Sequence, residues 1–119
     1  MQLITGLSAL HERLAPHFKP AFIQRDYTCF QFRFDDGEPF FLTVTPTTFE
    51  FSPGEKPDPT LTLYLDNHET CEALLEGRIN SMDAFMEGRY RADGNIVLSQ
   101  LLLYLFRNDD PTIAYRVQD

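Results

Sequence analysis

Residues 58–106 decide the fold, and they read DPTLTLYLDNHETCEALLEGRINSMDAFMEGRYRADGNIVLSQLLLYLF. Alternating leucines predict a strand at residues 60–65, and Asp66 or Asn67 is placed to cap a helix over 68–76 that ends at Gly77. A second short helix is expected from about residue 80 to Gly88. Residues 89–93 alternate again as a strand, and a long apolar helix follows over 96–106.

The last predicted helix is more apolar than a surface helix needs to be, because only Ser99 and Gln100 interrupt its apolar residues. At 100° per residue, one apolar arc covers about 200°, whereas roughly 100° suffices to face a core. That arc comprises Val97, Leu98, Leu101, Leu102, Tyr104, Leu105 and Phe106. Ile96 and Leu103 fall on the other side with the two polar residues. We therefore expect a core, a bound apolar ligand, a partner subunit or a membrane to cover the excess surface.

The upstream residues predict a helix and three strands. Leu3, Leu7, Leu10 and Leu14 recur at helical spacing, and Pro16 ends that helix. It is interpreted as packing on the domain's own core, the alternative being a lid or a membrane-touching helix. The strands are expected at residues 27–34, at 40–45 and around Phe49 and Phe51. An Asp-Gly hairpin at residues 35–38 connects the first two, and a Pro-rich crossover at 52–59 follows the third.

In the first of these strands, Phe30, Phe32 and Phe34 alternate with Cys29, Gln31 and Arg33, which predicts a strand buried on one face only. Counting the two downstream strands, the fold class is α+β, with a five-stranded mixed sheet and helices packed on one face.

Length and composition indicate a single soluble domain spanning residues 1–119. Hydrophobic residues make up 43% and charged residues 24% of the chain, and the net charge is −8. That acidic balance argues against a nucleic-acid partner and leaves at most weak contact with anionic membranes. No stretch reaches the roughly 18 apolar residues of a membrane span. Cys29 and Cys71 are interpreted as unpaired buried thiols in a reducing compartment, so a cytoplasmic location is expected.

The histidine, acidic and cysteine side chains do not form a recognisable catalytic or metal-binding motif. His11, His17 and His68 lie on separate predicted elements with no ligand at metal-binding spacing, so no metal or other cofactor is expected. The acidic residues of the 35–38 segment are expected there because such side chains are common in tight turns, so they do not indicate catalysis. Cys71 in the first turns of its helix is a weaker candidate for a nucleophile. The sequence therefore favours a binding protein over an enzyme.

Taken together, residues 58–106 resemble the sterol carrier protein 2 (SCP2) family. The resemblance rests on DPTLTL at 58–63, LLEGRIN at 74–80, AFMEGRYRA at 84–92 and DGN at 93–95, followed by the apolar helix. It implies an apolar tunnel between the sheet and the last helix that holds sterols, fatty acyl chains or other lipids. The chain ends Arg116-Val117-Gln118-Asp119, unlike the Ser-Lys-Leu peroxisomal address, which favours a bacterial-type stand-alone member.

The resemblance assigns the tunnel lining by motif position. The residues concerned are Phe30, Phe32, Leu63, Leu74, Met82, Phe85, Met86, Leu98, Leu101, Leu102 and Leu105. The expected function is non-enzymatic binding or transport of a lipid or isoprenoid-like molecule, including presentation of a lipophilic quinone precursor to modifying enzymes. The alternative is a protein–protein interaction module that fills its own core and uses the last helix, through Ile96 and Leu103, for a homodimer or another partner.

Overall fold

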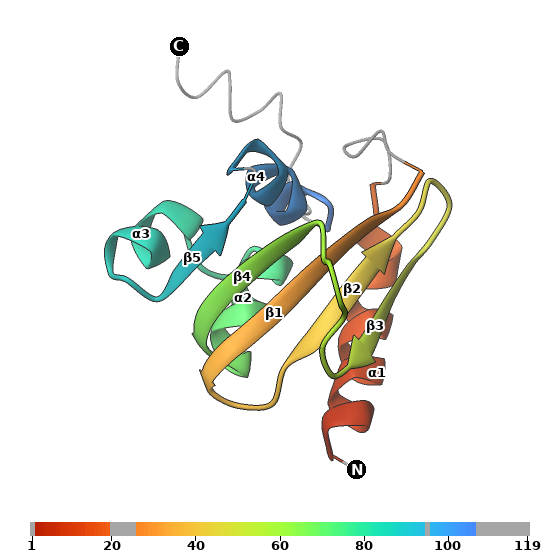
Figure 1. Ribbon diagram of the computed structural model, residues 1–119, viewed down its shortest axis with the longest axis horizontal. Helices are drawn as coiled ribbons and strands as arrows, with labels where there is room; N and C mark the ends of the chain where they lie inside the picture. Colours follow the sequence, from red (N-terminus) through yellow and green to blue (C-terminus); the bar gives the residue numbers. More distant parts are fainter. Residues whose placement is uncertain (1, 20–25, 95, 107–119) are drawn as a thin grey trace.

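The computed structural model describes residues 2–19, 26–94 and 96–106 (Figure 1). The helices in this part of the chain are α1 (Gln2–Leu14), α2 (His68–Glu76), α3 (Ser81–Met86) and α4 (Ile96–Tyr104), with the short 3₁₀ helix η1 (Ala15–His17) after α1. The strands are β1 (Thr28–Asp36), β2 (Phe40–Val44), β3 (Phe49–Pro53), β4 (Leu61–Asn67) and β5 (Tyr90–Asp93). The predicted strands and helices are all present, with small differences at their ends.

The five strands form one sheet in the order β3-β2-β1-β4-β5. β1 pairs antiparallel with β2 and parallel with β4, and the two outer pairings are antiparallel. The registers place Phe32 beside Phe40 on one side and beside Leu63 on the other. Because paired residues share a face of the sheet, these apolar side chains form one continuous surface. This confirms the predicted α+β class with a mixed sheet.

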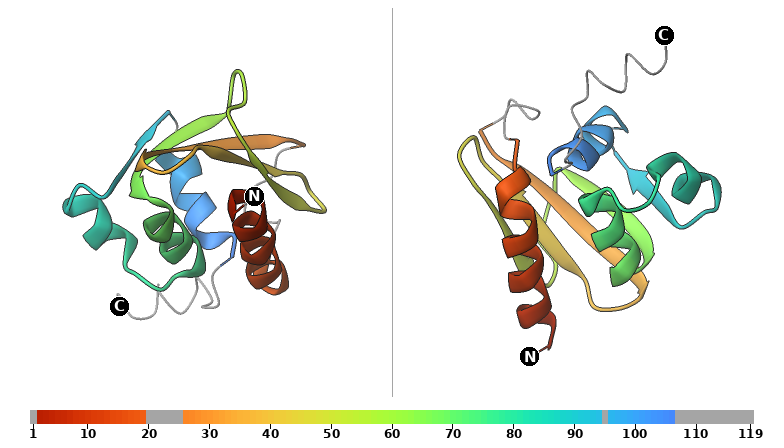
Figure 2. Two further views of the ribbon diagram at one scale, coloured as in Figure 1. Left: turned by 90° about the horizontal axis from the view of Figure 1, so that it is seen from below. Right: turned by 180° about the vertical axis from the view of Figure 1, so that it is seen from behind.

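Helices cover that apolar surface, and α1, α2 and α4 lie on the same side of the sheet (Figure 2). Leu7, Leu10 and Leu14 of α1 are buried, which confirms that α1 packs on the domain's own core; the side chain of Leu3 lies outside the described residues. The Arg13 guanidinium of α1 also donates hydrogen bonds to Glu72 and Glu76 of α2.

The opposite face of β1 is less open than its alternating sequence predicts. Cys29 and Gln31 are 2% exposed, so the expectation of a strand buried on one face only was wrong. The segment between β3 and β4 is the reason. The Gln31 amide donates to the Gly54 carbonyl at 3.1 Å, and its oxygen accepts from the Lys56 N–H at 2.8 Å. The Pro-rich crossover therefore lies across the outer face of the sheet and is fastened to it by Gln31.

The two helices between β4 and β5, α2 and α3, begin at asparagine caps. The Asn67 side chain accepts from the Thr70 N–H at 2.9 Å, and the Asn80 side chain accepts from the Asp83 N–H at 3.0 Å. Gly77 ends α2 in the left-handed conformation, with φ of 73°. Since glycine adopts this conformation without a steric cost, the chain turns sharply between α2 and α3, as the sequence predicts.

The buried face of α4 is rotated relative to its predicted apolar arc. Leu103, expected on the outward side, is 3% exposed, whereas Val97, expected inside, is 66% exposed. The cause is packing on α2, where Leu103 lies with Leu74 and Leu75 around one small internal cavity. The interface through Leu103 was therefore a wrong prediction. The side chains of Ile96 and Tyr104 and the polar tail from residue 107 lie outside the described residues.

Within residues 2–19, 26–94 and 96–106, no helix combines the length and the apolar character that crossing a bilayer requires.

Candidate functional site: an apolar pocket between α3, β5 and α4

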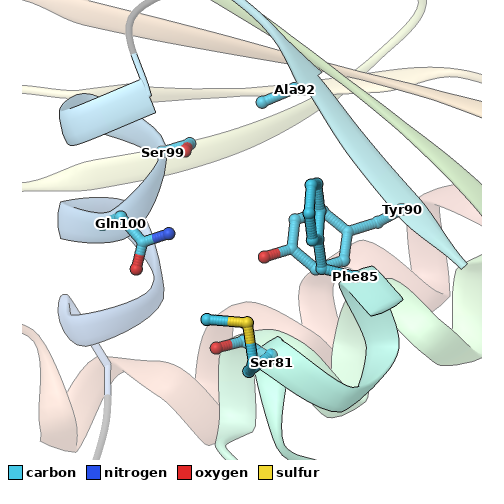
Figure 3. Close-up of a pocket in the computed structure, with 7 residues that line it drawn as sticks. Ser81, Phe85, Tyr90, Ala92, Ser99 and Gln100 are labelled. Carbon is cyan, nitrogen blue, oxygen red and sulfur yellow. The ribbon is translucent and has the colours of Figure 1, made fainter. Parts of the chain in front are cut away.

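A pocket of about 300 Å³ opens where α3, β5 and α4 meet. Figure 3 shows its walls, with α4 on one side and α3 and β5 on the other. Its lining is mainly apolar with several uncharged polar groups, and consists of Ser81, Met82, Phe85, Tyr90, Ala92, Ser99 and Gln100. This composition is typical of sites for small hydrophobic molecules, in which a few polar groups fix orientation.

The α3 wall is a short helix with little buried surface. Ala84 is its only buried residue, and the Ala84 carbonyl accepts a hydrogen bond from the Arg89 N–H at 2.9 Å. Met82 and Phe85 line the pocket but remain 62% and 52% exposed. These two large apolar side chains therefore form the rim of the pocket.

The β5 wall follows from strand alternation. Tyr90 and Ala92 pair with Leu65 and Leu63 of β4, so they lie on the face of the sheet that the helices cover. Tyr90 is 7% exposed, and burial raises the pKa of its hydroxyl above the ordinary value, which keeps the group protonated. The Phe85 ring lies edge-on to the Tyr90 ring, with centroids 5.8 Å apart.

The α4 wall is formed by the two residues that interrupt the apolar run, Ser99 and Gln100. Ser99 is 5% exposed and Gln100 is exposed, and the Gln100 side chain projects toward the space facing Tyr90 (Figure 3). The polar break in this helix is therefore explained by the pocket and not by contact with bulk solvent alone.

Most residues predicted to line a tunnel lie in the packed core instead of on this pocket. Those that are 4% exposed or less are Phe30, Phe32, Leu63, Leu74, Leu98, Leu102 and Leu105. Phe32, Leu63, Leu74 and Leu102 are among the residues around an internal cavity of about 10 Å³. A single water requires about that volume, so this cavity is too small for a lipid chain.

Of the remaining predicted residues, Met82 and Phe85 lie on the pocket, Leu101 is half-buried beside the core, and Met86 is 76% exposed. The sequence did not predict that Ser81, Tyr90, Ala92, Ser99 and Gln100 line a pocket. The alternation of Tyr90 and Ala92 with two arginines could have indicated the first pair as facing the helices. The polar break in the last helix could have indicated Ser99 and Gln100.

The other reactive side chains have structural roles. The His68 ring donates to the Glu38 carbonyl at 2.7 Å, which joins the β1–β2 hairpin to the start of α2. Burial raises the pKa of both Cys29 and Cys71, so neither thiol ionises readily. Among the residues that the structure describes, no three His, Cys, Asp or Glu side chains gather as a metal site.

The geometry defines a small module in which helices cover a mixed sheet and an apolar pocket opens at the β5 edge. With this architecture established, the chain belongs to the SCP-2 sterol transfer family, whose sequence profile matches residues 8–107. A search of curated proteins finds no match.

Solved structures share the fold at low sequence identity. Sterol Carrier Protein-2 from Aedes aegypti in complex with palmitate superposes with a TM-score of 0.57 at 19% identity, over 82% of this chain and 86% of that chain. The UbiJ-SCP2 ubiquinone synthesis protein gives 0.53 at 11%, over 82% and 73%. The stereoselective inverting sec-alkylsulfatase Pisa1 from Pseudomonas sp. gives 0.63 at 18%, over 82% of this chain but only 16% of the sulfatase.

Proposed function

We propose that this chain is a non-enzymatic binding or carrier protein for a lipid-like hydrophobic molecule, which it holds between α3, β5 and α4. The pocket of about 300 Å³ carries the proposal, because large apolar side chains at its rim are exposed and offer a surface for an apolar ligand. Membership of the SCP-2 sterol transfer family and the palmitate complex of the Aedes aegypti protein support the same ligand class.

The driving force would be burial of apolar surface. Each methylene group removed from water contributes about 0.8 kcal/mol, and the rings of Phe85 and Tyr90 offer broad contact area. Met82 on the rim has a flexible thioether side chain that adapts to differently shaped ligands. Exposed apolar side chains that gather around a groove are a feature of ligand-binding sites.

The volume constrains the mode of binding. Ligand pockets span roughly 300–1,000 Å³, so this pocket is at the small end and takes only part of a long lipid. The rest would extend past the exposed side chains of Met82 and Phe85, or α3 would move away from α4. Helix α3 is suited to such movement, since it has six residues and buries only Ala84.

The lining also favours binding over catalysis. It contains hydroxyl and amide groups but no histidine, carboxylate or thiol among the residues that the structure places there. Hydrolysis or group transfer requires a positioned acid, base or nucleophile beside the reacting bond. A pocket with this lining supports binding without a chemical step.

Titration with a fluorescent fatty alcohol tests the proposal. Wild-type protein is expected to bind the probe saturably, and Ala92→Phe to abolish binding because the new ring fills the pocket. Thr47→Phe is the matched control, since Thr47 is exposed in the turn between β2 and β3, beyond the strand at the other edge of the sheet. Circular dichroism verifies that both variants fold. Absence of saturable binding, together with absence of any co-purifying lipid, contradicts the proposal.

The finer form of the proposal is presentation of a lipophilic quinone precursor to modifying enzymes. The fold shared with the UbiJ-SCP2 ubiquinone synthesis protein supports it at the level of architecture. Mass spectrometry of lipids extracted from purified protein separates the two forms. A prenylated phenol or quinone in the extract supports the finer form, and ordinary membrane lipids alone count against it.

A second candidate function is a protein-interaction module, favoured by the exposure of Val97, Met82, Phe85 and Met86 around α3 and α4. In that case the rim contacts a second copy and not a ligand. Light scattering of wild type and Val97→Glu distinguishes the candidates. A dimer that dissociates in the variant supports the interface, and a monomeric wild type rules out the homodimer.

A further inference from the structure

We propose that the pocket selects lipids with an uncharged oxygen-containing head group, such as an alcohol, phenol, ketone or ester, over carboxylates, and that the Tyr90 hydroxyl is the group that recognises the oxygen. This inference rests on the proposed lipid-binding function and narrows its ligand class. It concerns the head group only and leaves the apolar part of the ligand unspecified.

Tyr90 carries the inference because the residue is largely buried, while its hydroxyl has no protein partner in the described part of the chain. The residue is 7% exposed, and its ring is held against Phe85. The hydroxyl faces the space between β5 and α4 (Figure 3). The hydroxyl of a largely buried tyrosine usually finds a hydrogen-bond partner. A ligand oxygen in the pocket would supply that partner.

The pocket lining offers hydrogen bonds of both kinds but no charge. The Ser81 hydroxyl and the Gln100 amide lie with Tyr90 around the same space, and each can donate or accept. An alcohol or a carbonyl matches such groups, because its oxygen needs one or two hydrogen bonds and no counter-ion. The lining therefore has the chemistry of a neutral head-group site.

The two arginines that flank Tyr90 are not available to a carboxylate. Arg91 alternates with Tyr90 along β5 and so lies on the opposite face of the sheet. Arg89 precedes β5, and its guanidinium donates a hydrogen bond to the Thr70 hydroxyl of α2 at 2.9 Å. The Arg89 guanidinium lies 3.3 Å from Asp66, and the Arg91 guanidinium lies 4.3 Å from the ring centre of Tyr64. Both cations are engaged away from the pocket.

Acidic residues add to this preference. Asp83 and Glu87 are exposed on and just after α3, and the whole chain carries a net charge of −8. A carboxylate entering the pocket would lose hydration without gaining a cation among the described lining residues. Burial of an unpaired charge is strongly unfavourable, whereas burial of a hydrogen-bonded hydroxyl is not.

Palmitate and cetyl alcohol provide the test, because they have the same chain length and differ only at the head. Each is titrated against wild-type protein by displacement of the fluorescent fatty alcohol. The alcohol is expected to bind at least about tenfold more tightly. Equal or tighter binding of palmitate overturns the inference while the lipid-binding function stands. If neither ligand binds, the proposed function fails and this inference fails with it.

Tyr90→Phe isolates the recognising group, because it removes one hydroxyl and keeps the ring. Affinity for cetyl alcohol should fall about three- to tenfold, the range of one neutral hydrogen bond, with palmitate affected less. Tyr64→Phe is the matched control on the other face of the sheet and should change neither affinity. An unchanged affinity of Tyr90→Phe for the alcohol overturns the assignment to Tyr90.

A gain-of-function variant tests the charge argument separately. Gln100→Lys places a cation on the pocket wall and should raise palmitate affinity at least about fivefold relative to cetyl alcohol. Thr47→Lys adds the same charge far from the pocket and controls for the change in net charge. If the two lysine variants change the ratio of affinities equally, local charge does not set the selectivity and the inference is contradicted.

Discussion

The ring of Phe85 lies edge-on to the ring of Tyr90, with 5.8 Å between their centres. One ring comes from α3 and the other from β5, and the sharp turn at Gly88, with φ of 75°, brings them together. Edge-to-face aromatic pairs contribute about 0.5–1.5 kcal/mol beyond the burial of their surface. The pair therefore joins the exposed helix to the sheet and forms one wall of the pocket.

Replacement of Phe85 separates its role in the ligand site from its role in stability. Because the side chain is 52% exposed, Phe85→Ala should lower the free energy of unfolding by only about 1 kcal/mol. Affinity for the fluorescent fatty alcohol should fall about three- to tenfold. Met86→Ala is the control, because Met86 is 76% exposed and is not among the residues that line the pocket. The affinity of this variant for the fluorescent fatty alcohol should match that of the wild type. Equal effects of the two variants would mean that the ligand contacts α3 elsewhere.

Gln31 should be among the more sensitive polar positions of the sheet. Its amide nitrogen donates to Phe40 and Gly54 carbonyls, each at 3.1 Å, and its oxygen accepts from Lys56. Gln31→Leu removes these three hydrogen bonds, two of which are partly buried, so urea denaturation should show a loss of about 2–4 kcal/mol. Thr43→Val, on the neighbouring strand, should cost less than about 1 kcal/mol. If Gln31→Leu lowers the free energy of unfolding by less than about 1 kcal/mol, water replaces the amide as hydrogen-bond partner and the prediction is wrong.

Gly94 should tolerate a side chain poorly for two reasons, its backbone conformation and a close neighbouring atom. Its φ is +127°, and a Cβ there would lie 2.9 Å from Leu61 Cδ1. Gly94→Ala should therefore lower the free energy of unfolding by about 2–3 kcal/mol. Gly54→Ala, with φ of +101° and no atom within 4 Å of the added carbon, reports the backbone strain alone. If both variants lose the same stability, the Leu61 contact relaxes without cost.

The Arg13–Glu76 ion pair predicts a pH dependence of stability. Burial by itself raises the pKa of Glu76, but hydrogen bonds from Arg13 and Arg78 outweigh it and hold the pKa below its ordinary value of about 4.5. A lowered folded-state pKa stabilises the protein above that ordinary value, and the contribution disappears as the pH falls through the folded-state pKa. Salt-bridge geometry agrees, with Arg13 Nε 2.9 Å from Glu76.

Arg13→Gln tests this contribution. Because the Arg13 side chain is 46% exposed, the loss at neutral pH should stay below about 1 kcal/mol, and it should shrink as the pH falls below the ordinary glutamate pKa of 4.5. Urea denaturation at neutral pH and at successively lower pH values measures the difference. Arg33→Gln, which removes an ion pair exposed on both sides with Glu55, should show a smaller loss. A loss for Arg13→Gln that does not change with pH would point to packing and not to charge.

Much of the fold was predictable from local patterns. Alternating phenylalanines and leucines indicated the strands, and Asn67, Gly77 and Asn80 marked helix ends where the structure has them. The rotation of α4 was not predictable, because a helix with leucine on nearly every side does not itself specify which face is buried. That choice depends on α2, whose Leu74 and Leu75 meet Leu103.

The candidate site was harder to predict than the fold. Met82 and Phe85 followed from the family resemblance, whereas Tyr90 and Ser99 belong to the pocket because β5 and α4 converge there. A resemblance assigns residues by their order along the chain, but whether Leu102 faces a cavity or another side chain depends on packing. In this structure Leu102 is fully buried in the core.

The most direct test of the central claim uses the methionine methyl groups, since the chain has only three methionines. Protein carrying ¹³C in these methyl groups is titrated with cetyl alcohol and observed by NMR, and Met82→Leu and Met86→Leu assign the signals. A ligand in the pocket should shift the Met82 signal saturably and move the Met86 signal much less. If the Met82 signal stays in place while cetyl alcohol binds, the ligand site lies elsewhere and the account is contradicted.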